Sequence, residues 1–149
     1  MTVLDTPHGH LIRFFHGEKV VAGLIHFAKE QNLRAAWVQG LGALRRAEIG
    51  YYDLENKTYL KRQIEEDVEI ASLTGNFSRL EDQPIPHLHV VLGQRDFTAL
   101  GGHFFEGEAG ATVEISLQRF ADVSLERGRD EAIGLNLWSL PKTFTPTSE

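Results

Sequence analysis

The sequence of 149 residues contains no cysteine, which excludes disulfide bonds and thiolate metal ligands. Its longest uncharged runs fall well short of the ~18 apolar residues that a membrane helix requires, so we expect no contact with a membrane. The N-terminus, MTVLDTPHGH, lacks a basic region followed by an apolar one and does not resemble a secretory signal. Together these absences predict a cytoplasmic protein.

Excess positive charge is missing as well, because the formal net charge is −6 at pH 7. An acidic chain lacks the global field that draws proteins to phosphate backbones, which disfavours nucleic acid as a partner. The sequence also contains no nucleophile elbow, HExxH helix, P-loop or dinucleotide fingerprint. We therefore favour a binding module over an enzyme.

The length of the chain predicts one domain, spanning residues 1–149, with a single hydrophobic core. We expect the ordered part to run from about residue 11 to residue 140. The N-terminus before it and the tail PKTFTPTSE after it, which is rich in Pro, Thr and Ser, are predicted to fray.

One segment has a clear helical pattern, from about Glu18 to Gln31. Gly17 can precede its first turn, and Asn32 suits the left-handed residue that ends a helix. His26 lies beside the apolar stripe and is interpreted as a surface or boundary residue. The stripe that we expect to face a core consists of Val20, Val21, Leu24, Phe27 and Ala28.

Most of the remaining chain has the short alternating pattern of β-strands. The expected strands are 11–16, 35–38, 47–52, 58–64, 68–73, 87–92, 102–106 and 111–118. Gly40 and Gly42 are interpreted as a turn between two of them. Many closely spaced strands with one helix predict an α+β fold, in which a mainly antiparallel, curved sheet carries one principal α-helix packed on it.

The stretch PHLHVVLGQRDFTALGGHFFEG, residues 86–107, holds three of the seven histidines. His87 and His89 are two residues apart on one predicted strand, so both project from the same face, roughly 7 Å apart. A turn around residues 94–97 would place His103 nearly opposite them, but a one-residue slip in register would turn it to the other face. Gly101 and Gly102, just before it, are typical of a bulge or a close backbone approach.

Three neutral imidazoles are the ligand set of an open zinc site with a fourth position for water or another ligand. Nickel, cobalt or copper would suit the same nitrogens. The alternative is that the histidines are unconnected side chains on a half-buried sheet, and the pattern alone permits either interpretation. His8 and His10 have the same spacing, but they lie near the terminus and are taken as incidental.

Several segments, taken together, resemble the PPC ("plants and prokaryotes conserved") domain. HLHVVLG, GGHFFEG and ATVEISL are similar to its central signature, and VQGLGALRRAEIGYYD, VEIASLTGNF and RGRDEAIGLNLWSL resemble its other segments in order. The resemblance covers roughly residues 11–140. It implies a single domain with an antiparallel sheet, assembled as a homotrimer. It further implies a metal, usually zinc, held by His87, His89 and His103.

Plant members of that family carry an AT-hook, and the family is often labelled DNA-binding for this reason. We expect no AT-hook in this protein, because none lies within these 149 residues. Its only similar string is Arg127-Gly128-Arg129-Asp130, in which an acidic residue replaces the proline of the hook. In plant members the domain itself is linked to self-association and to binding other proteins, which suits an acidic module.

Three functional hypotheses follow. The first is a metal-containing homotrimeric module that binds other proteins or a small anionic ligand. The second is a regulatory DNA-binding protein whose basic patch would consist of Arg45, Arg46, Lys61, Arg62 and Arg95. The third is a zinc-dependent hydrolase or lyase acting on a small molecule, with Glu69, Glu106 or Glu114 as general base.

Trp37 and Trp138 are assigned to core or interface packing.

Overall fold

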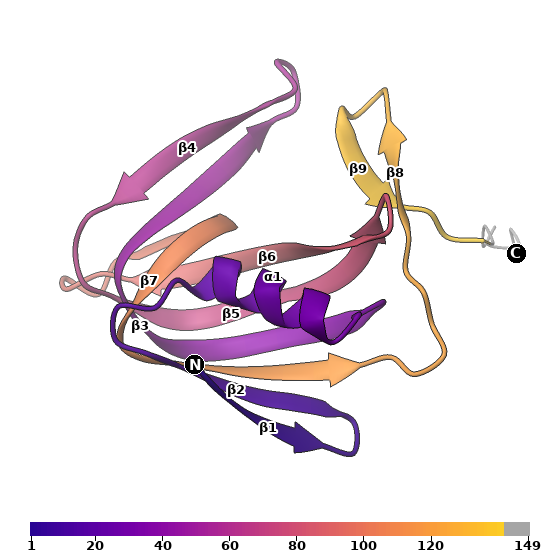
Figure 1. The fold of residues 1–149 in the computed structure, drawn as a ribbon. Coiled ribbons are helices and arrows are strands. Elements are labelled where there is room, and N and C mark those ends of the chain that lie inside the picture. Colours follow the sequence, from indigo (N-terminus) through magenta and orange to yellow (C-terminus); the bar gives the residue numbers. More distant parts are fainter. Residues whose placement is uncertain (142–149) are drawn as a thin grey trace, which may run out of the picture.

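The computed structural model describes residues 1–141, which form ten elements of regular structure. One α-helix and nine strands follow one another along the chain (Figure 1). Their bounds are β1 (Thr2–Thr6), β2 (Gly9–Phe15), α1 (Val20–Glu30), β3 (Ala36–Asp53), β4 (Thr58–Ile64), β5 (Val68–Leu80), β6 (Gln83–Gly93), β7 (Ala99–Arg119), β8 (Arg127–Asp130) and β9 (Leu135–Trp138). The C-terminal tail that was predicted to fray lies mostly outside the described residues.

Seven strands form one antiparallel sheet in the order β1-β2-β7-β6-β5-β3-β4. The sheet curls so strongly that β3, which is separated from β7 by β5 and β6 in this order, also pairs with β7 directly. Within residues 1–141 strand β8 pairs with β9 alone, and the two form a separate hairpin at one end of the sheet (Figure 1). The fold is thus α+β with a mostly antiparallel, curved sheet, as the sequence predicted, and its helix is short.

Helix α1 has eleven residues and buries the five apolar side chains that the sequence assigned to its stripe. They join one core cluster with Phe14, Phe77 and Leu88 from the sheet. The helix ends where expected, because Asn32 adopts a left-handed backbone with φ 44°. No helix in residues 1–141 is both long and apolar enough to cross a membrane.

The N-terminal residues were predicted to fray, and this is wrong. Thr2–Thr6 pairs in register with Arg13–Gly9 of β2, and Pro7 and His8 alone connect the two strands. His10 is buried, rests edge-on against Phe27 and bonds through Nδ1 to Asp5 at 2.8 Å. Backbone pairing and this buried contact hold the first residues in place.

Two expected chain breaks are also absent. The predicted strands at 35–38 and 47–52 fall, apart from residue 35, within one strand of 18 residues, β3. Those predicted at 102–106 and 111–118 fall within one strand of 21 residues, β7. The glycines that suggested a turn mark a register shift between Gly40 and Gly42 inside β3. Gly42 has φ 139°, and a Cβ there would lie 2.2 Å from the Thr112 carbonyl oxygen. These glycines permit close strand contact inside a bent strand.

The late segment RGRDEAIGLNLWSL, for which no strand was predicted from its pattern, forms the β8–β9 hairpin. Gly134, with φ 83°, lies in its turn. Neither tryptophan lies in the core, since Trp37 is 36% and Trp138 43% exposed. The indole Nε1 of Trp138 instead donates to Asn76 Oδ1 at 3.4 Å, which ties the hairpin to β5.

The two glycines before His103 offer a matched test of this packing. A Cβ on Gly102 would lie 2.6 Å from the Gly50 carbonyl oxygen, whereas a Cβ on Gly101 would make only an ordinary contact at 3.4 Å with the Val90 carbonyl oxygen. We predict that Gly102→Ala lowers the free energy of unfolding by about 1–3 kcal/mol, because β3 must move away from β7. Gly101→Ala should change it by roughly 0.5 kcal/mol or less. Urea unfolding of both variants measures the difference, and equal losses would contradict the assigned backbone contact.

Candidate metal centre

The register between β6 and β7 brings the three histidines together. His89 lies directly opposite His103 in the antiparallel ladder, and His87 lies two residues along β6 on the same face. The intervening Leu88 and Val90 are buried, as expected. The expected turn is present too, because residues 94–98 connect the two strands. The register that the sequence left open is the one that makes the histidines converge.

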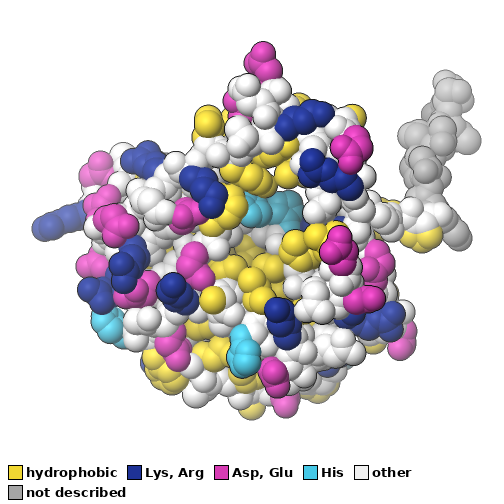
Figure 2. Space-filling view, turned by 45° about the horizontal axis from the view of Figure 1, so that its top comes forward, with side chains coloured by type: hydrophobic (Ala, Val, Ile, Leu, Met, Phe, Trp, Pro, Cys, Tyr) yellow, Lys and Arg dark blue, Asp and Glu magenta, His cyan; other side chains and the backbone are white. Residues whose placement is uncertain are grey.

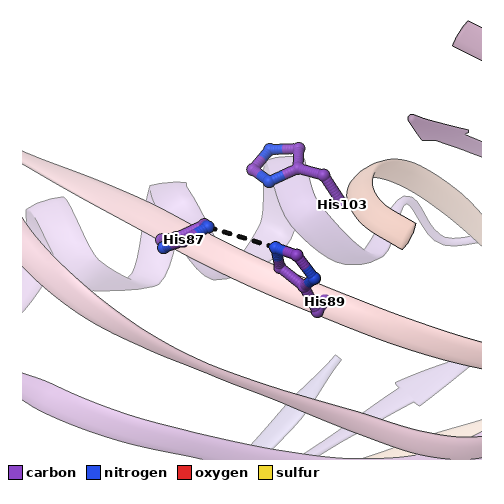
Figure 3. Close-up of side chains that lie close together, drawn as sticks. All are labelled: His87, His89 and His103. Atoms are coloured by element: carbon purple, nitrogen blue, oxygen red, sulfur yellow. Dashed lines mark hydrogen bonds between the residues drawn. The ribbon is translucent and has the colours of Figure 1, made fainter. Parts of the chain in front are cut away.

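The three imidazole rings surround a common space (Figure 3). One ring nitrogen from each of the three lies within 4.8 Å of the others. The Nε2 atoms of His87 and His89 are 3.2 Å apart. Two nitrogens bound to one zinc ion at about 2.0–2.1 Å and at a tetrahedral angle lie about 3.3 Å apart. His87 and His89 are therefore spaced like two ligands of one divalent ion, and His103 offers a third nitrogen within 4.8 Å of both.

Burial keeps two of the histidines, His87 and His103, neutral. It lowers the pKa of His87 from its ordinary 6.5 to about 4, and the charges of Arg127 and His89 act in the same direction. Burial likewise lowers the pKa of His103 to about 4, with further lowering by the other two histidines, Arg127 and Lys61. Neutral imidazole is the form that coordinates metals, so at neutral pH neither of these two rings has to lose a proton before an ion binds.

His103 also has an unsatisfied atom. Its Nδ1 is buried and has no hydrogen-bond partner among the described residues. The ring lies 4.7 Å from Phe105 and 5.1 Å from Tyr59, measured between ring centroids, and neither aromatic ring can accept a full hydrogen bond. Such an orphaned nitrogen costs free energy unless something coordinates it, which again fits a metal.

The face that carries the histidines is hollowed. Figure 2 shows histidine side chains recessed there, with hydrophobic side chains next to them and Lys or Arg side chains around the rim. Tyr59 of β4 and Phe105 of β7 contribute aromatic walls, and burial raises the pKa of Tyr59. Both rings lie against His103, so they shield one side of its imidazole from water and strengthen electrostatic interactions there.

The three glutamates considered as general bases do not join the histidines. Glu106 accepts hydrogen bonds from the backbone N–H groups of Val21 and Ala22, at 2.8 and 3.1 Å, so it caps helix α1. Glu69 and Glu114 are exposed strand residues elsewhere on the sheet. The group of candidate metal ligands in residues 1–141 consists of the histidines alone and includes no carboxylate.

Three of the five basic residues considered as a nucleic-acid patch form ion pairs. Arg45 and Arg46 share Glu108, and Lys61 pairs with Glu48. The guanidinium of Arg46 bonds to the Glu108 carboxylate through Nε at 2.9 Å. Two carboxylates therefore offset two of the five positive charges, and Arg62 and Arg95 form no ion pair within residues 1–141.

Sequence reasoning missed one residue of the site, Arg127 of β8. It lies 24 positions beyond His103, in the string Arg127–Asp130 that was compared above with an AT-hook. Its charge nevertheless lowers the pKa of both His87 and His103. No local motif marks it. Only the docking of the β8–β9 hairpin against β5 brings it to the histidines.

Solved structures support this architecture. A metal-containing protein of Archaeoglobus fulgidus is 37% identical over 94% of this chain and 100% of its own, with a TM-score of 0.82. A plant- and prokaryote-conserved protein of Pyrococcus horikoshii is 34% identical over 89% of this chain and 92% of its own, with a TM-score of 0.83. A candidate DNA-binding protein of Ralstonia eutropha is 28% identical over 93% of this chain and 96% of its own, with a TM-score of 0.86. No curated protein matches the chain.

The profile of the Plants and Prokaryotes Conserved (PCC) domain matches residues 2–121. This range holds the complete seven-stranded sheet, from the start of β1 to the end of β7, and all three histidines. The chain therefore belongs to the Plants and Prokaryotes Conserved domain family.

Proposed function

We propose that this protein is a metal-binding module of its family, which holds one zinc ion through His87, His89 and His103. The observation that carries the proposal is the 3.2 Å separation of the His87 and His89 Nε2 atoms, with His103 across the ladder. The metal-containing relative from Archaeoglobus fulgidus supports it. Zinc is preferred because three imidazoles without a carboxylate form a typical open zinc site.

A three-histidine site has room for one more ligand. With no carboxylate among its described neighbours, a bound zinc ion would have a fourth position for water or a small molecule. Zinc in such a setting polarises a bound oxygen and lowers the pKa of bound water. The chain's own residues keep the imidazoles of His87 and His103 neutral and place an aromatic ring against His103.

Binding is a better description of this site than hydrolysis. A hydrolase or lyase needs a group that moves a proton next to the metal, and the glutamates considered for that role lie elsewhere or hold a helix. DNA binding has weaker support, because the net charge is −6 and the main cations pair with carboxylates. DNA binding is retained as the alternative because the Ralstonia eutropha relative is described as DNA-binding.

We also infer that the module assembles as a homotrimer. An apolar hollow of about 690 Å³ opens on β1, β2, β3 and β7, away from the histidines. Leu4 is 63%, Leu11 47% and Leu41 57% exposed on this surface. Such a group of exposed leucines is unusual on a protein surface that faces only water. A second copy of the chain would cover these side chains, and the number three comes from the family resemblance.

The metal proposal predicts about one zinc per chain when the protein is purified without a histidine tag and supplied with zinc. His103→Ala should lose most of it, because two imidazoles without a third ligand hold zinc weakly. His26→Ala is the matched control, since this histidine is exposed on α1 and should keep the full content. Elemental analysis of the three proteins gives the answer, and a metal-free wild type would refute the proposal.

The assembly proposal predicts that light scattering gives three times the mass of one chain. Leu41→Arg should shift the mass toward a single chain, because a buried interface would have to accept a charge. Leu60 of β4 is equally exposed, at 57%, but lies outside the apolar hollow, so Leu60→Arg should remain trimeric. If both variants keep the wild-type mass, the contact lies elsewhere.

A further inference from the structure

Arg127 is fixed in place by three neutral acceptors. Its Nε donates to Ser78 Oγ at 2.6 Å, one Nη to the Asn136 carbonyl oxygen at 2.8 Å, and the other Nη to Asn76 Oδ1 at 3.1 Å. Ser78 and Asn76 are themselves buried. A guanidinium has five N–H donors, so two remain, one on each Nη. The side chain is held rigidly and still has a pair of donors available.

The charge of Arg127 has no counterion among residues 1–141. It forms no ion pair there, and burial lowers its pKa, which is the direction expected for an uncompensated cation. Lys61, the other cation whose charge acts on His103, differs because it pairs with Glu48. A half-buried guanidinium without a carboxylate is costly, and an anionic ligand would offset that cost.

The ladder places Arg127 beside the histidines. Asn76, which accepts from Arg127, lies directly opposite His87 in the pairing of β5 with β6, so both side chains leave the same face of the sheet. Tyr59, whose ring lies against His103, also feels the charge of Arg127. The guanidinium therefore borders the hollow into which the fourth metal position would open.

We propose that Arg127 and the open position of the metal together bind the carboxylate group of a small organic acid. This inference rests on the proposed metal site. One carboxylate oxygen would occupy the free coordination position, and the guanidinium would donate to the carboxylate through its remaining N–H groups, a pairing for which its planar fork is suited. The aromatic walls of Tyr59 and Phe105 favour an organic anion with a short apolar part over a strongly hydrated inorganic one.

The test uses the full-length protein loaded with Co²⁺, whose visible absorption reports directly on ligands of the metal. Metal content is measured first, so that a failure of the metal site is recognised separately. Propionate is then titrated and should change the absorption saturably, while inorganic phosphate and chloride should bind more weakly. A parallel calorimetric titration of the metal-free protein should show much weaker binding.

Arg127→Gln should retain cobalt and bind propionate roughly 10- to 100-fold more weakly, the effect of losing hydrogen bonds to a charged group. Arg127→Lys keeps the charge without the fork and should fall between that variant and the wild type. Lys61→Gln is the matched control, because its charge is already paired with Glu48. It should change the affinity by less than about fivefold.

Three results would overturn the inference while leaving the metal site intact. They are no response of the cobalt protein to propionate, equal binding of phosphate or chloride, and an Arg127→Gln variant that binds like the wild type. If both Arg127 variants lose cobalt while the wild type keeps it, Arg127 is a structural support of the histidines, and the inference is wrong as well.

Discussion

The register of β6 against β7 is the constraint on which the site depends. His89 faces His103 only in this register, and a slip by one residue would send one of them to the core. Two glycines permit each histidine strand to pack closely against its other neighbour. A Cβ on Gly75 of β5 would lie 2.0 Å from the His87 carbonyl oxygen, and one on Gly102 of β7 would lie 2.6 Å from that of Gly50 in β3. Close backbone contact thus joins β6 to β5 and β7 to β3 on the two sides of the histidine pair.

The same packing determines the electrostatics. Three imidazoles and one guanidinium share a half-buried hollow that has no carboxylate beside the histidines in residues 1–141. Burial keeps the imidazoles of His87 and His103 neutral, which suits a cation, and Arg127 has no ion-pair partner in residues 1–141, which suits an anion. A metal ion alone would increase the positive charge of the hollow. A metal ion together with a carboxylate would satisfy both requirements, because the anion contacts both positive centres.

Local patterns in the sequence predicted the parts of the fold that local physics determines. The periods of helix and strand predicted the apolar stripe of α1 and the shared face of His87 and His89. The residue type of Asn32 predicted where the helix ends. The continuity of β3 could not be predicted, because Gly40 and Gly42 have the same residue types whether they form a turn or a bulge. Arg127 was beyond prediction for another reason: its position depends on a long-range docking that no periodicity encodes.

Arg127 also lies beyond the region that the family profile matches, since that region ends at residue 121 and the β8–β9 hairpin follows it. The histidines belong to the matched sheet, whereas the guanidinium comes from a hairpin that contacts β5 through Asn76 and Ser78. A change in this hairpin would alter the anion contact and leave the β6–β7 register untouched. On our proposal, the sheet therefore supplies the histidines that bind the metal, and the hairpin determines which small molecule the metal accepts.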